Sequence, residues 1–163
     1  MKKTNLKTFC ALLAISFAII SCSKDDNSSS SAQDYISIGT YAGSIQVSDD
    51  PQTQLGYIYN ANVTVLKKGS EVKIKLIGDL NVDREYTGTI ITNSNNTYNI
   101  NINKQTKPTI KNATESLVIN NNELSLLVRV LNESENVKTN ATPSTTITIT
   151  GKLNFIGTGL IKQ

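Results

Sequence analysis

Apolar and polar residues alternate along most of the chain after residue 33. Five runs show the pattern clearly: Gly56–Lys68, Glu71–Leu80, Thr97–Lys104, Glu123–Leu131 and Thr145–Phe155. In the first run, Tyr57, Tyr59, Ala61, Val63 and Val65 are expected to share one face. A period of two with many β-branched residues is typical of half-buried antiparallel strands. The pattern therefore predicts a chain built mainly of strands.

Three further stretches have the same character, which brings the expected number to eight: Ile36–Val47, Glu85–Thr92 and Ser116–Asn120. The breaks between runs carry turn residues, such as Gly69 and the asparagine clusters at 93–96 and 120–122. Glycine and asparagine tolerate the left-handed backbone of tight hairpins. The longest gap, Glu133–Ser144, is polar and contains Pro143, so an exposed loop is expected there.

Short hairpin connections favour one architecture over another. We expect an all-β fold, in which an eight-stranded antiparallel meander closes as a barrel. The alternative is a two-sheet β-sandwich, which requires longer crossovers than the chain offers. If the barrel holds a cavity, its candidate lining comes from the inward rows: Tyr41, Tyr57, Tyr59, Ala61, Tyr86 and Tyr98. These tyrosines fit a core or barrel lining better than an exposed platform for a sugar.

The first residues have the features of an export signal. Lys2, Lys3 and Lys7 precede the apolar stretch Phe9–Ile20. A membrane-spanning helix needs about 20 apolar residues, and this stretch is shorter. A basic head followed by a short apolar segment is typical of a cleaved signal peptide, here assigned to residues 1–21.

The segment Ile19-Ile20-Ser21-Cys22 resembles the lipobox of bacterial lipoproteins. The resemblance implies that Cys22 becomes lipidated, that it starts the mature chain, and that palmitate or a similar acyl chain anchors it. Several acyl chains together give stable membrane attachment. A soluble secreted protein with an incidental cysteine, such as Cys10, is the alternative. Cys22 lies where the apolar stretch meets a polar one, which favours lipidation.

Residues 22–33 are rich in serine and predict a disordered tether. Lys24, Asp25 and Asp26 resemble the acidic export signal that follows the lipidated cysteine in surface lipoproteins of the phylum Bacteroidota. That resemblance implies lipid anchoring in the outer membrane with exposure at the cell surface. A merely solvated tether is the alternative reading of the same residues.

The remaining residues, 34–163, resemble the calycin-like or lipocalin-like β-barrel domains that Bacteroidota lipoproteins carry. The resemblance rests on Ile38–Val47, on the strand-like segment Asn60–Leu76, and on the closing segment Ile147–Gly159. Gly39, Thr40 and Tyr41 occupy the place of the Gly-x-Trp motif in the first lipocalin strand. The family implies a barrel that binds a small or apolar ligand.

Charge and chemistry narrow the function further. Removing the three lysines of the signal leaves 13 basic residues against 13 acidic ones, so no nucleic-acid partner is expected. The chain has no histidine, which removes the commonest general base and transition-metal ligand. Asp79, Asn81 and Asp83 have the spacing of a calcium loop, but Arg84 stands where that motif requires glycine.

The expected function is therefore non-catalytic, without a cofactor or metal. The first hypothesis is an envelope lipoprotein whose calycin-like barrel binds a small or apolar ligand. The alternative is a structural or protein-interaction module of the outer membrane with a filled barrel. A hydrolase that uses Asp79, Asp83 or Glu85 is a third, more remote alternative.

Overall fold

Nine antiparallel strands make up the computed structural model of this protein, which describes residues 34–163. The strands are β1 (Ile36–Asp49), β2 (Leu55–Lys68), β3 (Glu71–Gly78), β4 (Val82–Ser94), β5 (Thr97–Lys107), β6 (Lys111–Thr114), β7 (Ser116–Asn120), β8 (Glu123–Lys138) and β9 (Thr146–Lys162). Every predicted strand overlaps one of them. The predicted signal peptide and tether, with Cys22, Lys24, Asp25 and Asp26, lie outside the described residues.

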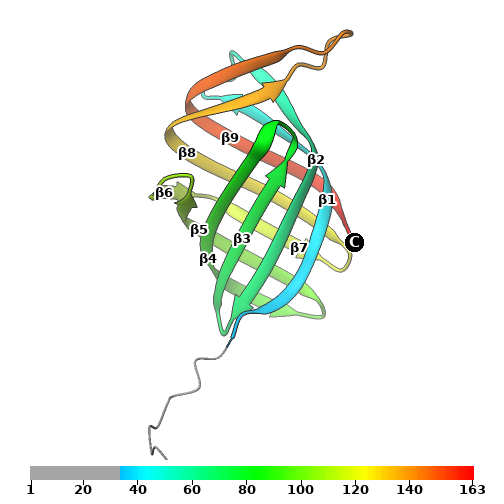
Figure 1. Ribbon diagram of the computed structural model, residues 1–163. Coiled ribbons are helices and arrows are strands. Elements are labelled where there is room, and N and C mark those ends of the chain that lie inside the picture. The colour runs from blue at the N-terminus through cyan, green and yellow to red at the C-terminus, as the bar shows by residue number, and fades with distance from the viewer. Residues whose placement is uncertain (1–33) are drawn as a thin grey trace, which may run out of the picture. The chain divides into compact units, whose positions relative to one another are not determined.

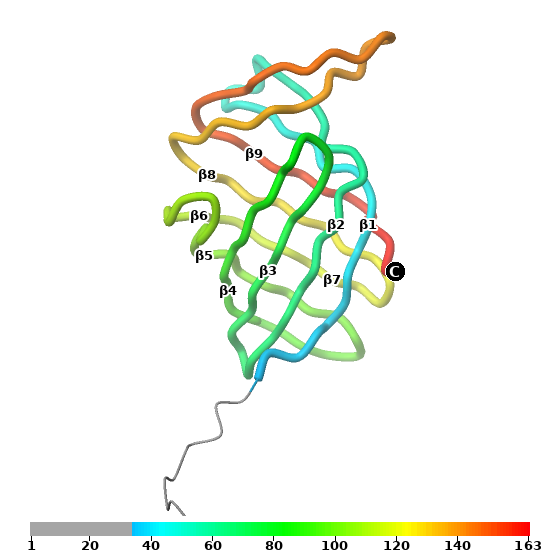
Figure 2. Tube along the Cα trace, viewed as in Figure 1, coloured from blue at the N-terminus to red at the C-terminus, as the bar shows by residue number. Residues whose placement is uncertain are grey.

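The sheet closes on itself. Strands β1 to β5 pair in chain order, β5 continues through β7 to β8, and β9 pairs with both β8 and β1. Figures 1 and 2 show the resulting ring of strands. This closure confirms the predicted antiparallel meander and removes the open edges that an unclosed sheet would expose. All the pairings, and all the core residues of the described part of the chain, lie within residues 36–162.

Two features of the sheet differ from the prediction. The short strand β6 is inserted between β5 and β8, and its four residues carry too little alternation to be recognised. The prediction of an exposed loop over Glu133–Ser144 is wrong for its first half, because β8 continues to Lys138 and pairs with β9. Backbone hydrogen bonds hold this hairpin, and they do not require the apolar side chains on which the prediction relied.

The long hairpins extend beyond the other strands at one end of the barrel (Figure 1). There β2 pairs with β8 through Tyr57 and Lys138, so β1, β2, β8 and β9 form a narrower, four-stranded continuation. Its centre is filled by four fully buried side chains: Val47, Ile58, Val137 and Ile149. We call this the narrow end of the barrel.

The interior of the wider part is filled with apolar side chains. Its largest fully buried members are Tyr41, Tyr86 and Phe155, packed among isoleucine, leucine and valine from every side of the ring. The buried polar residues of the described chain are Ser48, Arg84 and Gln105. A small barrel of this width holds either packed side chains or one small ligand, and side chains occupy this interior.

A bulge in β2 reverses the expected orientation of two tyrosines. In the pairing of β1 with β2, Gly43 lies opposite Ala61, and the next pair is Ile45 with Ile58. The residues between these pairs have no partner, and one of them, Asn60, has a positive φ of 50°. The extra residues shift the alternation, so Ile58 and Ala61 both point inward and are fully buried. The predicted common face is therefore wrong for Tyr57 and Tyr59, which are only half-buried and lie on the outer side. A β-bulge reverses which face the following side chains occupy, while the chain continues as the same strand.

Candidate functional site

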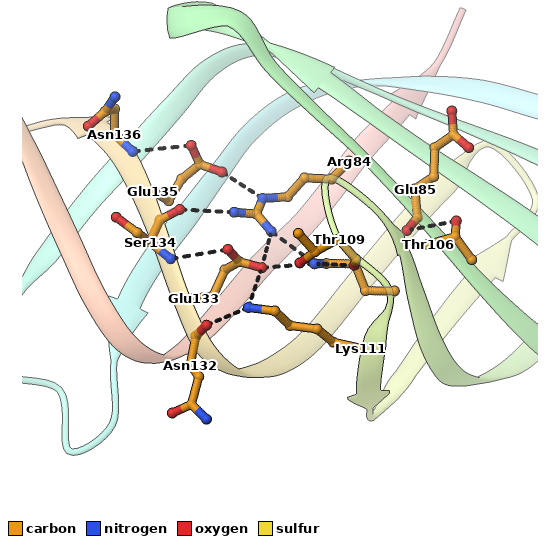
Figure 3. Close-up of polar contacts among 11 residues, drawn as sticks. Arg84, Glu85, Thr106, Thr109, Lys111, Asn132, Glu133, Ser134, Glu135 and Asn136 are labelled. Carbon is orange, nitrogen blue, oxygen red and sulfur yellow. Dashed lines mark hydrogen bonds and ion pairs between the residues drawn. The ribbon is translucent and has the colours of Figure 1, made fainter.

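Arg84 lies inside the barrel, where only 3% of its side chain is exposed. Its Nε donates a hydrogen bond to Oε2 of Glu135 at 2.6 Å, and Nη1 donates to Oε1 of Gln105 at 2.9 Å. Its Nη2 donates to the backbone oxygen of Ser134 at 3.2 Å, and Nη1 lies 3.4 Å from Oε2 of Glu133. Figure 3 shows Arg84 reaching from β4 to this segment of β8. The guanidinium thus joins two strands that are not neighbours in the sheet.

The surrounding groups complete this cluster. Gln105 donates to Glu133 at 2.8 Å and to the backbone oxygen of Thr109 at 3.2 Å, while Nζ of Lys111 lies 3.4 Å from the same carboxylate (Figure 3). Two cations therefore face two carboxylates. Because its charges and main hydrogen-bonding groups are already paired, we interpret the cluster as a structural brace near the narrow end.

Burial and pairing act in opposite directions on the ionisable groups of this region. Burial tends to raise the pKa of Glu133, but the Gln105 hydrogen bond and the charge of Arg84 outweigh it and hold the pKa below its usual value. Tyr86 is two residues from Arg84 on the same face of β4. Its hydroxyl is buried without a hydrogen-bond partner in the described chain, and desolvation raises its pKa. The phenol is therefore neutral at physiological pH.

At the end of the barrel opposite the narrow end, the surface is hollowed by a depression of about 500 Å³. We call it the mouth. It is lined by residues from two hairpin turns and from the strands beside them, including both termini of the domain: Ser37, Ile38, Tyr41, Lys67, Asn96, Tyr98, Ile119, Asn121, Asn122 and Lys162. Tyr41 and Ile119 are buried, whereas the asparagines and Lys162 are exposed. The mouth thus has a polar rim above a floor to which the buried side chains of Tyr41 and Ile119 contribute.

Backbone hydrogen bonds hold this rim together. The amide of Asn121 donates to the backbone oxygen of Asn96 at 3.2 Å, and that of Lys162 donates to Asn122 at 2.8 Å. Asn96 and Asn121 both have positive φ, a conformation that asparagine tolerates better than most residues. The two turns and the last strand are therefore fixed relative to one another before any ligand arrives.

The mouth carries positive charge. Its lining residues include two lysines and no carboxylate. Nζ of Lys67 lies 5.4 Å from the centroid of the Tyr98 ring, a cation–π contact that leaves its charge unneutralised. The stem of Lys162 lies over Gly39, where an added Cβ would come within 2.8 Å of Lys162 Cε. A side chain at Gly39 would therefore displace this lysine from the rim.

The predicted lining residues lie in three different places. Tyr41, Ala61 and Tyr86 are buried in the interior. Tyr41 also forms part of the floor of the mouth, and half-buried Tyr98 lies on its wall. Tyr57 and Tyr59 lie on the outer side, as described above.

Two of the three carboxylates weighed as catalytic or calcium-binding candidates, Asp79 and Asp83, take part in separate ion pairs, whereas Glu85 forms none in the described chain. Asp79 accepts a hydrogen bond from Nζ of Lys138 at 3.0 Å, and Asp83 pairs with Lys107. Residues 34–163 contain no group of three or more acidic, cysteine or histidine side chains placed to hold a metal ion. In the same part of the chain, no helix is long and apolar enough to cross a membrane.

Comparisons with known proteins leave the family open. No protein-family model matches the chain, and no curated protein or solved structure shows significant similarity to it. The calycin resemblance therefore stays a prediction, and the functional argument rests on this chain alone.

Sequence reasoning missed the residues that matter most at both ends of the barrel. Arg84 continues the inward row of β4, between Val82 and Tyr86, so a charge within an apolar row was the available signal. Lys67 and Lys162 carry no such signal, because each lies near the end of its strand. Their position around one hollow depends on the pairing of β1 with both β2 and β9.

Proposed function

We propose that this chain is a non-catalytic envelope lipoprotein whose barrel binds a small polar ligand, bearing negative charge, at the mouth. The observation that supports the binding site is the depression of about 500 Å³ above a filled interior. Its volume lies within the usual range for small-molecule sites. Lys67 and Lys162 supply charge, the asparagine side chains supply hydrogen-bond donors and acceptors, and the half-buried Tyr98 supplies apolar surface.

The filled interior favours the mouth over an apolar ligand deep inside the barrel. Fully buried side chains such as Tyr86 and Phe155 occupy the space that such a ligand would need. The same packing also supports the second candidate function, a structural or protein-interaction module that acts through its outer surface. The two candidates differ in one respect, because only the first requires a small molecule in the mouth.

The binding test uses the domain 34–163, which contains the complete closed sheet. Amide NMR spectra are recorded during titration with inorganic phosphate, citrate, glucuronate and glucose 6-phosphate, with glucose as the neutral probe. We expect shifts at the mouth, around Asn96, Tyr98 and Asn122, for at least one anionic probe and not for glucose. The double variant Lys67→Met/Lys162→Met should abolish them.

A matched control keeps the net charge of that double variant. Lys75→Met/Lys104→Met removes two exposed lysines outside the mouth, and binding should persist. Equal weakening by both double variants would indicate general charge attraction. The absence of any shift at the mouth with these anions and with a small-molecule extract of the cell envelope would favour the protein-interaction alternative.

Anchoring is tested separately on the full chain. We propose that Cys22 carries the lipid and that Lys24, Asp25 and Asp26 direct the protein to the outer face of the outer membrane. Labelling with a palmitate analogue should mark the wild-type chain and fail with Cys22→Ala. Replacing both aspartates by alanine should retain the label but reduce cleavage by protease added to intact cells.

A further inference from the structure

The outer side of the β2 bulge carries a second hollow. Its lining residues are Ala42, Gly43, Ser44, Tyr59, Asn60 and Asn62, and its volume is about 450 Å³. The hollow exists because residues are added to both strands here, so that Ser44 on β1 and Asn60 on β2 have no regular partner. Both residues are exposed. A bulge that redirects side chains in this way is often found beside functional sites.

Two stacked tyrosines adjoin this hollow. The rings of Tyr57 and Tyr59 have centroids 5.9 Å apart and planes inclined by only 21°. The two rings are stacked with an offset, and Tyr59, but not Tyr57, lines the hollow. Stacking fixes the orientation of a side chain that would otherwise rotate freely. The Tyr59 ring thus forms a fixed aromatic wall.

Polar groups surround this wall at positions set by hydrogen bonds. Nδ2 of Asn60 donates to Oδ1 of Asp79 at 3.0 Å, and Nδ2 of Asn62 donates to the backbone oxygen of Asn60 at 3.2 Å. Both amide groups keep an oxygen acceptor and a second N–H donor. The hydroxyl of Ser44 adds a group that can donate and accept.

The lining itself carries no charge, in contrast to the mouth. Asp79 lies beside the hollow, but Nζ of Lys138 neutralises it at 3.0 Å. A charged ligand would find no unpaired partner in this arrangement, and a purely apolar ligand would bury the amides without hydrogen bonds. A ligand with one apolar face and a ring of hydroxyl groups satisfies both kinds of lining.

We propose that this hollow binds a neutral pyranose unit of a saccharide, whose C–H face lies on the Tyr59 ring. Its hydroxyl groups hydrogen-bond to Asn60, Asn62 and Ser44. The proposal is independent of the proposed function, because this site shares no lining residue with the mouth. The barrel therefore has a site for a sugar on its wall and one for an anion at its end.

The test records amide NMR spectra of the domain 34–163 during titration with neutral hexasaccharides at millimolar concentrations. The hexasaccharides are those of glucose (α-1,4 and β-1,4 linked), mannose, galactose and xylose. At least one should shift the amide resonances of Ser44, Tyr59, Asn60 and Asn62, and leave those of the mouth unchanged. Tyr59→Leu should raise the dissociation constant by about tenfold or more, whereas Tyr59→Phe should retain binding because it keeps the ring.

Two further variants separate loss of the site from loss of the fold. Asn62→Ala should weaken binding with an otherwise unchanged spectrum, and Tyr35→Ala, which removes a tyrosine outside the hollow, should have no effect. If no oligosaccharide shifts these resonances, or if Tyr59→Leu binds as tightly as wild type, the proposal is wrong. Failure here would leave anion binding at the mouth unaffected.

Discussion

Nε of Arg84 and Oε2 of Glu135 lie 2.6 Å apart inside the barrel and join β4 to β8 across 51 residues of sequence. Neither group has bulk water to replace its partner, since 3% and 13% of their side chains are exposed. Breaking a buried pair by removing one member leaves an uncompensated charge, which costs more than the pair itself contributes. The first two predictions concern the cluster to which this contact belongs.

Removing the guanidinium should destabilise the barrel strongly. We expect Arg84→Met to lower the free energy of unfolding by about 3–5 kcal/mol, because the buried carboxylate of Glu135 would lose its cationic partner and Glu133 would lose one of its two. Arg129→Met is the matched control, since Arg129 pairs with Glu115 where 37% and 32% of the side chains are exposed. It should cost about 1 kcal/mol or less. Urea unfolding followed by circular dichroism measures both, and equal losses would contradict the structural role of Arg84.

Acid should weaken the same cluster. The pKa of Glu133 is lower in the folded chain than its ordinary value of 4.5, so the unfolded chain binds the proton more readily. Ionised Glu133 therefore contributes fully to the free energy of unfolding at a pH above its ordinary pKa. This contribution is lost as the pH falls through the lower pKa of the folded chain. We expect Glu133→Gln to show a flatter decline of unfolding free energy with falling pH. Exposed Glu123→Gln should keep the wild-type slope, and a Glu133→Gln profile parallel to wild type would contradict the coupling.

The register of β8 predicts a large difference between two aspartate substitutions. Val128 is fully buried and pairs with Phe155, so Val128→Asp should cost more than about 3 kcal/mol. Lys73 is exposed on β3, and Lys73→Asp should cost less than about 1 kcal/mol. Urea unfolding of the two variants provides the comparison. The reverse ranking would show that these strands face the other way.

Adding even a methyl group at Gly88 should lower the free energy of unfolding. A Cβ at this position would lie 2.4 Å from the backbone oxygen of Asn101 on the paired strand, where the register of β4 and β5 shifts. Gly88→Ala should therefore cost about 1–3 kcal/mol through displacement of the backbone. Thr89→Ala, at the exposed neighbouring position, should cost less. Thermal unfolding measures the difference, and an unchanged midpoint for Gly88→Ala would mean that the strands separate easily.

The strands could be predicted because their signals are local, and closure was then inferred from the cost of leaving sheet edges open. Alternation within Glu71–Leu80 or Thr97–Lys104 reports which residues meet a core, and asparagine or glycine in short breaks reports tight turns. An antiparallel meander of this length then removes its edges by closing. The candidate sites were less accessible, since Tyr41 and Tyr98 were recognised as aromatic lining but not as floor and wall of a charged mouth.

The amino-acid sequence by itself therefore determined the all-β class, the approximate strand positions and the meander order, because side-chain periodicity is a property of neighbouring residues. The tertiary structure decided what depends on distant partners. It placed Glu135 against Arg84, brought Lys67 and Lys162 to one rim, and turned Tyr57 and Tyr59 outward through the Asn60 bulge. Such contacts arise only when the ring closes, since closure sets which remote residues share a position and a face.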